Sequence, residues 1–376
     1  MKKGRRRQRF RDVAVTLFLT EAEQLIATAE APEAAELVTN TVDLDPNRTL
    51  SVKGATKAVA LWSNCKSKCS LLAVGTASSV TVFSVTLPNE SNERQTMEAS
   101  PMEASVVQEF EHSVPLQDIA WSPSTSFMPE PVCIRFATAS LDNEVRIFSS
   151  DLTENEVNVL SGHRGLVNAV AFEQQTGEAL ASVGDDNSCR IWGLDGAQQA
   201  RIALRSAGTA VVWHPEELGK LLVAEKCGTL RLYNAMSGTA AHVHGGGPAG
   251  HPPGSRLVPG EQPAFGSSRW QPLLPVGDGT LQVGHLLLHF MPHRPLDHKP
   301  LHSNGASELA FSYLQQEVCA SRGHPGNSVK VFNFKTNQVL LDVSLNVGRG
   351  LAWHPHCPVL AFGGDGRAHL FRVITC

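Results

Sequence analysis

Short runs of alternating apolar and polar residues recur along the chain, and each ends in an aromatic side chain. The runs are SSVTVF, NEVRIF, NSCRIW, GTLRLY, NSVKVF and GRAHLF. They contain β-branched or aromatic residues at every second position, and a polar or glycine-containing turn precedes each of them. This pattern predicts β-strands with one face directed to a core.

Two further runs precede each aromatic-ended run in a constant order. A run that contains Trp or Phe comes first, as in DIAWSP and AVVWHP, and a run of small residues follows, as in RFATAS and ALASVG. The whole order occurs six times. Trp121, Trp213 and Trp353 close runs of the first kind just before a turn, and we interpret them as core-packing residues.

The spacing of the terminal aromatics gives the length of the repeated unit. It is 44 residues from Phe148 to Trp192 and 41 from Trp192 to Tyr233. The 99 residues from Tyr233 to Phe332 fit two units and an insertion, with a degraded fifth unit that ends at Phe290. Seven units of about 42 residues are therefore predicted. Repeats of this length with four strands each are typical of β-propellers.

One unit resembles the WD-repeat family closely, because Gly162 and His163 precede LASVGDD and CRIW. In that family a His, a Ser or Thr, an Asp and a Trp form a buried hydrogen-bonded chain within one blade. The resemblance implies this structural role for His163, Ser182, Asp186 and Trp192. A buried indole N–H needs an acceptor, which a hydroxyl supplies. The predicted fold class is all-β, a seven-bladed WD40-type β-propeller.

The last unit is short of a strand, since five residues follow Phe371. An unpaired edge would attract other chains, so we predict that residues 48–54 (RTLSVKG) supply the fourth strand and close the last blade. The predicted organisation is a basic, largely disordered or short-helical head over 1–45 and a propeller over 46–376. A Gly/Pro/His-rich insertion is expected at about 240–265.

Charge and composition narrow the function classes. Residues 1–11 hold seven Lys or Arg and no acid, which leaves 25 basic against 36 acidic residues in the rest. Such an acidic body disfavours direct nucleic-acid binding by the propeller. No apolar stretch approaches the roughly 18 residues of a membrane helix, so no membrane insertion is expected. The apolar stretch 13–19 is short and acids follow it, which disfavours a secretory signal. The scattered cysteines favour a reducing compartment.

Candidate chemistry is weak. Cys65 and Cys69 lack a nearby second pair for zinc, and prolines interrupt the histidine-rich stretch 285–302. His163 beside Asp186 could be a catalytic pair, but its repeat context favours a structural network. Motifs of nucleotide-binding loops, zinc proteases and serine hydrolases do not occur. We therefore expect no enzyme, no metal, no cofactor and no small-molecule substrate.

The stretch from His112 to Met236 is similar to the small WD-repeat nucleoporins of the Y-shaped outer-ring complex of the nuclear pore. DIAWSPS, VLSGHRGLVNAVAF and ALASVGDDNSCRIWGLDG carry the likeness, and GLAWHPHCPVLAFGGDG agrees with it; the basic head and residues 240–305 depart from it. The resemblance implies a non-catalytic scaffold at the nuclear envelope. Its partners would be a large helical-solenoid nucleoporin and other outer-ring nucleoporins. It would support pore assembly, protein import and messenger-RNA export, and reach kinetochores in mitosis.

Two other functions remain open at this point. A substrate receptor of a ubiquitin ligase, or an adaptor of a chromatin complex, would present a charged central opening to peptides, and the weak motif on the top face argues against it. A propeller hydrolase would need a cluster of acids, or a His with a nucleophile, along the channel. A fold alone does not decide among these functions.

Overall fold

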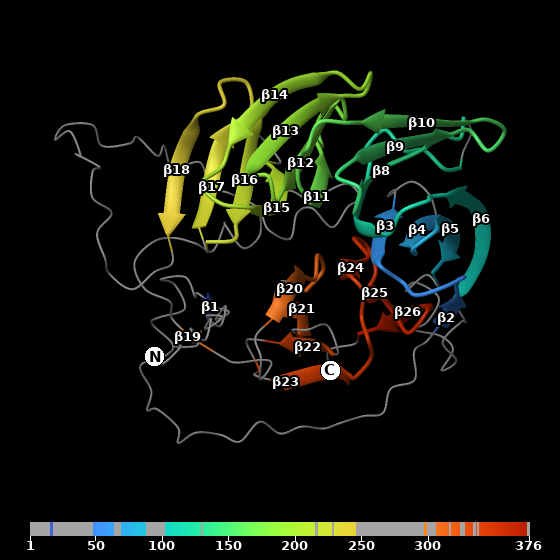
Figure 1. Ribbon diagram of the computed structural model, residues 1–376. Helices are drawn as coiled ribbons and strands as arrows, with labels where there is room; N and C mark the ends of the chain where they lie inside the picture. The colour runs from blue at the N-terminus through green and yellow to red at the C-terminus, as the bar shows by residue number, and fades with distance from the viewer. Residues whose placement is uncertain are drawn as a thin grey trace, which may run out of the picture.

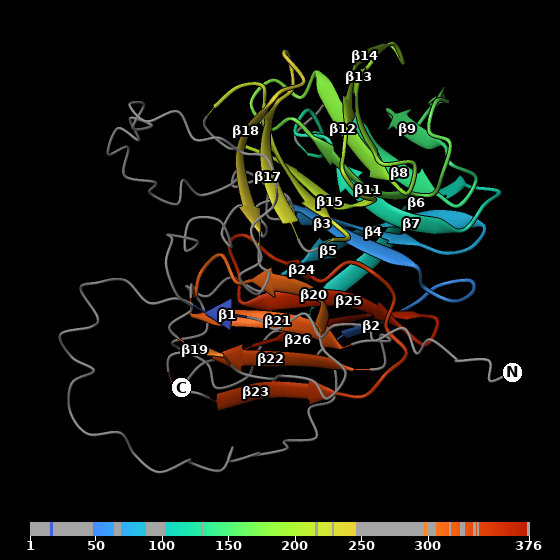
Figure 2. The same cartoon turned by 60° about the vertical axis from the view of Figure 1, so that its left-hand side comes forward.

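The all-β prediction is confirmed by the computed structural model, in which sheets follow one another around a common centre (Figures 1 and 2). Within the described residues there are six four-stranded antiparallel sheets and no helix. The structure describes residues 16–17, 48–63, 69–87, 102–128, 131–214, 217–227, 229–245, 297–298, 306–315, 317–323, 328–333, 336 and 338–373.

The first four sheets each consist of four strands that are consecutive in the chain. The first sheet contains β3 (Ala58–Ser63), β4 (Cys69–Gly75), β5 (Ser79–Thr86) and β6 (Glu103–Glu111). The second contains β7 (Leu116–Trp121), β8 (Ile134–Ser140), β9 (Val145–Ser150) and β10 (Asn155–Leu160). The third contains β11 (Val167–Phe172), β12 (Ala179–Gly184), β13 (Ser188–Gly193) and β14 (Gln198–Ala203). The fourth contains β15 (Gly208–Trp213), β16 (Lys220–Glu225), β17 (Thr229–Asn234) and β18 (Ala240–Gly245).

Two more four-stranded sheets lie nearer the C-terminus. The penultimate sheet contains β20 (Ala306–Phe311), β21 (Val318–Gly323), β22 (Val329–Asn333) and β23 (Gln338–Val343). The last sheet contains β24 (Ala352–Trp353), β25 (Val359–Gly364), β26 (Arg367–Arg372) and β2 (Arg48–Ser51). A separate two-stranded sheet pairs β1 (Thr16–Leu17) with β19 (Asp297–His298).

The composition of the middle strands reflects their place between neighbouring sheets. Every residue of β13 is buried, and on β12 Leu180 lies opposite Trp192 while Ala181 lies opposite Ile191. Both faces of such a strand are covered, so small and β-branched residues replace the alternation of a half-exposed strand. The outer strand β14 is mostly exposed, and half of its residues are polar. The run of small residues in each unit is therefore the signature of a strand packed on both faces.

The predicted pairing between the start and the end of the sequence is present over four residue pairs. Arg48 lies opposite Leu370 and Ser51 opposite Arg367, so β2 is the edge strand of the last sheet next to β26. Leu50 is buried in one apolar cluster with residues of the first and last sheets. The number of seven blades and the closing of the whole ring stay predictions, because the fifth unit lies outside the described residues.

Two predicted connections are shorter than expected. The polar composition of residues 88–105 (PNESNERQTMEASPMEAS) predicts a loop, but β6 already begins at Glu103 within this stretch. β18 occupies Ala240–Gly245, the first part of the predicted insertion, because its residues complete the fourth sheet by pairing with β17. Apart from β1, the head lies outside the described residues, and so does the remainder of the insertion.

Short linkers fix the relative direction of the first four sheets. Residues 112–115, 161–166 and 204–207 join one sheet to the next. Each of these sheets has four antiparallel strands, and a linker leads from its last strand to the first strand of the next sheet. The first strands therefore all start at the same end of the sheets, which we call the linker end. The connections between first and second strands, and between third and fourth strands, lie at the opposite end, which we call the turn end.

No helix in the described ranges is long and apolar enough to cross a membrane.

Candidate functional site

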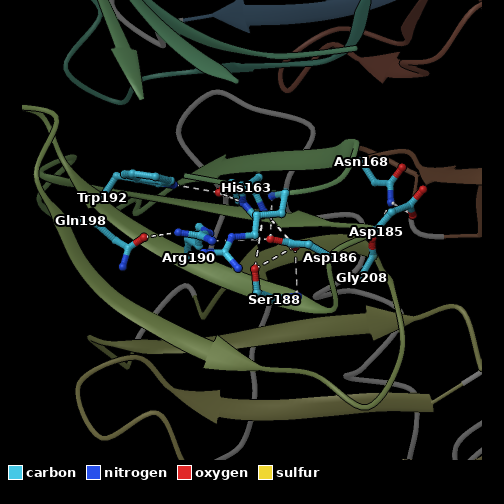
Figure 3. A network of polar contacts seen from close by, with 11 residues as sticks. His163, Asn168, Asp185, Asp186, Ser188, Arg190, Trp192, Gln198 and Gly208 are labelled. Atoms are coloured by element: carbon cyan, nitrogen blue, oxygen red, sulfur yellow. Dashed lines mark hydrogen bonds and ion pairs between the residues drawn. The ribbon is translucent and has the colours of Figure 1, made fainter. Parts of the chain in front are cut away.

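The four side chains that the sequence singled out form one network at the third sheet, and Figure 3 shows His163, Asp186 and Trp192 of this network. Trp192 Nε1 on β13 donates to Ser182 Oγ on β12 at 2.8 Å. Ser182 Oγ lies 2.8 Å from Nε2 of His163, and His163 Nδ1 lies 2.9 Å from Oδ1 of Asp186. Ser182, Trp192 and His163 are buried. The network thus joins β12 and β13 to the linker before β11 and to the turn between β12 and β13.

Hydrogen bonds keep the carboxylate of this network ionised. Burial by itself would raise the pKa of Asp186, but hydrogen bonds from His163, from Ser188 Oγ at 2.8 Å and from the Arg164 backbone N at 3.1 Å outweigh it and lower the pKa to about 2. Arg190 Nη2 also lies 3.6 Å from Asp186 Oδ2.

The imidazole of His163 is neutral near pH 7. Burial lowers the pKa of His163 against the opposing effect of Asp186. With the proton on Nδ1, His163 donates to Asp186 and its Nε2 accepts from the Ser182 hydroxyl, which in turn accepts from Trp192. Each donor then has an acceptor, which is the arrangement that stabilises a buried polar chain.

The second sheet keeps only part of the network. His112 Nε2 lies 3.2 Å from Thr138 Oγ1, but Phe148 stands where the third sheet has Trp192, so no indole N–H is available. Asp142 pairs instead with Arg146, at 2.5 Å between Oδ2 and Nη2. The reduced sequence pattern of this unit therefore corresponds to a rearranged set of contacts.

The fourth sheet has a buried acidic group that the sequence analysis missed. The side chain of Glu225 on β16 is fully buried, and its Oε1 lies 3.0 Å from Nε of Arg231 on β17. Its Oε2 accepts backbone N–H groups of Arg205 at 3.1 Å and Ser206 at 3.0 Å. Glu225 ends an apolar run and Arg231 occurs inside the next strand, two positions along from the residue opposite Glu225, and these opposite charges on neighbouring strands were the available signal.

Tryptophans link each of three sheets to the sheet before it. Each Trp ends the first strand of its sheet and donates from Nε1 to a backbone carbonyl of the preceding first strand. The pairs are Trp121 with Ala60 at 3.1 Å, Trp213 with Ala171 at 2.9 Å, and Trp353 with Ala310 at 2.9 Å. The sequence predicted core packing for these residues, and the structure adds a directional bond between sheets.

Charged groups bridge the first strands near the centre of the molecule. Asp118 Oδ2 on β7 accepts from the Val170 backbone N on β11 at 3.0 Å. Loss of hydration raises the pKa of Asp118 to about 7, against the opposing effects of the Val170 N–H and the Arg349 charge. Arg349 Nη1, just before β24, donates to the carbonyl oxygen of Asn168 on β11 at 2.7 Å.

The contact between Arg349 and Asn168 joins residues far apart in the sequence. Asn168 also bonds to the Gly208 carbonyl of β15 at 2.9 Å through Nδ2 (Figure 3). Glu308 on β20 accepts backbone N–H groups of Gly350 at 3.1 Å and Leu351 at 3.0 Å. Side chains of four sheets therefore hold neighbouring or opposite first strands together.

The first and last sheets meet through backbone and side-chain contacts. Val59 N donates to the Arg349 carbonyl at 3.0 Å, and Ser70 Oγ lies 2.8 Å from His354 Nε2. Burial and the nearby His356 lower the pKa of His354 to about 3, so its ring is neutral. A polar cavity of about 470 Å³ opens at this seam, with Thr56 in its wall.

The other candidate positions fall into two groups. Cys65, the histidine-rich stretch 285–302 and the fifth unit lie outside the described residues, apart from the backbone of β19. Burial raises the pKa of the Cys189 and Cys319 thiols to about 12, so both are unreactive core residues. In the described part of the chain no group of three or more His, Cys, Asp or Glu side chains could hold a metal ion.

Known proteins resemble this chain both locally and over most of its length. Residues 104–149 and 154–193 match the family described as WD domain, G-beta repeat. Nucleoporin Nup37 of Mus musculus is 35% identical over 262 residues, which cover 68% of this chain and 76% of the relative.

The same relationship holds for two further relatives. Nucleoporin Nup37 of Homo sapiens is 34% identical over 262 residues, covering 68% of this chain and 76% of the relative. Nucleoporin Nup37 of Drosophila melanogaster is 29% identical over 311 residues, covering 81% of this chain and 90% of the relative. The first match begins in the outer strand β6 and the second just before the outer strand β10, and each ends in the third strand of the next sheet, so each spans a junction between sheets.

Proposed function

Because this chain belongs to the Nup37 family of WD-repeat nucleoporins, we propose that it is a scaffold subunit of the Y-shaped outer-ring complex of the nuclear pore. The observation that carries the proposal is the identity of 35% to a Nup37 over 68% of the chain. The chain docks on the large helical-solenoid nucleoporin of this complex and contacts other outer-ring nucleoporins. It resides at the nuclear envelope, supports pore assembly, protein import and messenger-RNA export, and joins kinetochores in mitosis.

The geometry of the polar network supports a non-catalytic role. Ser182, His163 and Asp186 have the residue types of a hydrolytic triad. Ser182 is fully buried, however, and its oxygen already accepts the indole N–H of Trp192. A substrate cannot approach this hydroxyl without opening the sheet, and we infer that the network acts through stability.

The substrate-receptor alternative is supported less well by the centre of the molecule. Arg349 reaches from the last sheet to Asn168 of the third sheet. A side chain therefore crosses the centre at this level, where a receptor propeller would hold a peptide. The contact fits a propeller that is braced as a rigid scaffold and binds partners elsewhere on its surface.

Affinity purification tests the proposed function. The full chain, expressed with an affinity tag, is isolated from detergent-solubilised nuclear envelopes, and its partners are identified by mass spectrometry. We expect outer-ring nucleoporins in near-equal amounts with the chain, and a rim of fluorescence around the nucleus in interphase cells. Recovery of ubiquitin-ligase or chromatin subunits without outer-ring nucleoporins would contradict the proposal and favour the alternative.

The mitotic part of the proposal needs its own readout. Fluorescence imaging of the tagged chain in dividing cells should show it at kinetochores after the nuclear envelope breaks down. A chain confined to the cytoplasm throughout mitosis would remove the kinetochore role and leave the pore role intact.

A further inference from the structure

Long apolar side chains are exposed at the turn end of the second and fourth sheets. Met128 and Leu152 lie in the two connections of the second sheet and are 60% and 43% exposed. Leu218 and Met236 lie in the equivalent connections of the fourth sheet and are 64% and 90% exposed. So much exposed surface adds little to folding, because apolar groups stabilise a fold in proportion to the area they bury.

The backbone at two of these positions makes the exposure more unusual. Met128 has a φ of 47° and Leu152 a φ of 74°, both in the left-handed region that side chains disfavour. The third-to-fourth connections of the next two sheets place glycines in this region, Gly196 at 87° and Gly238 at 65°. Glycine adopts this conformation without a steric penalty.

At the linker end, positive φ values occur at residue types that tolerate them. The other described residues with positive φ, glycines aside, are small polar ones at the linker end: Asn143, Asn187 and Asp365. Selection for stability alone would place glycine or asparagine at positions 128 and 152 as well. The presence of Met128 and Leu152 at these positions therefore points to a role outside folding.

Acidic side chains are exposed at the same end of the sheets as these apolar groups. Glu178 and Asp195 are exposed at the turn end of the third sheet, between the two apolar pairs, and Asp151 and Glu154 flank Leu152. Within the described residues none of these four carboxylates forms an ion pair with Lys or Arg, whereas Glu217 of the fourth sheet is paired with Lys220. The surface thus combines apolar side chains with unneutralised negative charge.

We propose that the turn end of the second, third and fourth sheets is the surface by which the chain docks on the helical-solenoid nucleoporin. The docked segment presents apolar side chains flanked by Lys or Arg. The assignment rests on the proposed function for the identity of the partner and on charge complementarity for its chemistry. Apolar contacts supply the binding energy, and the carboxylates orient the basic segment and speed its encounter.

A second exposed apolar patch offers a matched control. Val157 and Val159 on β10 are 49% and 46% exposed. Both are β-branched residues within a strand, and strand propensity accounts for them without a partner. Replacement of each by Thr preserves shape and strand propensity while removing apolar surface.

The first experiment compares binding with stability in the full chain. Two double variants are compared with the wild type: Met128→Gly with Leu152→Gly, and the control Val157→Thr with Val159→Thr. Each is titrated against the co-purified solenoid nucleoporin, and its melting temperature is measured. We expect the glycine variant to melt at or above the wild-type temperature and to bind at least about tenfold more weakly. The control should bind within about threefold of the wild type. A glycine variant with wild-type affinity overturns the assignment of this surface.

A second experiment separates failure of the surface from failure of the proposed function. A photo-crosslinking amino acid is placed at position 236 or, as the control, at position 157, in the full chain in cells. Crosslinks from position 236 to a Lys- or Arg-rich segment of the solenoid nucleoporin support the surface. Crosslinks to that nucleoporin from position 157 alone retain the pore function and overturn the surface. If the tagged chain recovers no outer-ring nucleoporin and position 236 yields no crosslink, both proposals fall.

Discussion

The indole N–H of Trp213 is bonded to the carbonyl oxygen of Ala171 at 2.9 Å, and this bond joins the first strand of the fourth sheet to that of the third. Trp121 and Trp353 make the same contact with their preceding sheets. A propeller has little chain connection between blades, so such bonds add direction to a contact that is otherwise apolar packing. The repeated Trp at the end of the first strand therefore determines how adjacent sheets are aligned.

Trp213→Phe should lower the free energy of unfolding by about 1–3 kcal/mol. The substitution keeps an aromatic ring but removes the N–H donor, so the Ala171 carbonyl loses a partner at a buried site. Urea unfolding followed by circular dichroism measures the effect. Trp121→Phe should behave alike, and the two effects should add to within about 0.5 kcal/mol because the sites share no partner. Unchanged stability in both variants would show that the bonds between sheets are not important.

Ser182→Ala should destabilise the chain by about 1–3 kcal/mol, because Trp192 Nε1 and His163 Nε2 would both lose a partner in a buried site. Trp192→Ala should cost more, about 3–5 kcal/mol, since it also leaves a cavity. Ser161→Ala is the control, because Ser161 is exposed and its loss should stay within about 0.5 kcal/mol. If Ser182→Ala matched this control in thermal unfolding, the network would not contribute to stability.

Acid should weaken the fold in two stages. Burial holds the folded-state pKa values of His163 and His354 below the unfolded value of about 6.5, that of His354 at about 3. Between these pKa values the unfolded chain binds more protons, so stability falls as the pH drops from 7. The slope is at most about 1.4 kcal/mol per pH unit for each histidine. Asp186, with a folded-state pKa of about 2, adds stability above pH 4 that is lost between pH 4 and 2.

Urea unfolding at a series of pH values measures these slopes. His354→Gln keeps a donor for Ser70 and cannot be protonated. Its stability should therefore change less than that of the wild type between pH 6.5 and 4. Equal slopes for the two proteins would contradict the low pKa of the buried ring.

Asp118 should affect the pH dependence of stability in the opposite direction to the histidines, and Asp118→Asn tests this. The folded-state pKa of Asp118 is raised to about 7, so this group contributes stability below pH 4 that is lost as the pH rises through 7. Asn keeps an oxygen for the Val170 N–H and carries no charge. The variant should gain stability relative to the wild type between pH 4 and pH 7, as judged by urea midpoints, and this difference should stay level above pH 7. A relative stability that stays constant over this range would mean that Arg349 keeps Asp118 ionised.

Local sequence patterns were sufficient to locate the first three strands of each described four-stranded sheet and to place the four network residues in one unit, but they did not locate outer strands such as β6 and β18. The alternation in NSCRIW and the small residues in ALASVG correspond to β13 and β12. His163, Ser182, Asp186 and Trp192 lie within one unit, and their spacing in a WD repeat already implies contact. Such features depend on neighbouring strands, which the repeat itself specifies.

Contacts between units were not predictable from these patterns. The acceptor of Trp213 is a backbone carbonyl, which has no sequence signature. Arg349 and Asn168 meet only because the sheets surround a common centre, so their contact depends on the curvature of the whole assembly. Glu225 has the appearance of a strand-ending acid, and its burial depends on Arg231 and on backbone groups of the linker before β15.

Truncations at two points test how much of the start of the sequence the propeller needs. Removal of residues 1–45 should leave the melting temperature within a few degrees of the wild type, because the proposed propeller begins at 46. Removal of 1–52 also deletes β2, exposes the edge of β26, and takes buried Leu50 out of the cluster shared by the first and last sheets. We expect that chain to lose about 3 kcal/mol or more and to aggregate, since an open edge pairs with other chains. Differential scanning fluorimetry and size-exclusion chromatography measure both effects. If both truncated chains behaved like the full chain, the pairing of β2 with β26 would be dispensable, and the last sheet would need no strand from the start of the sequence.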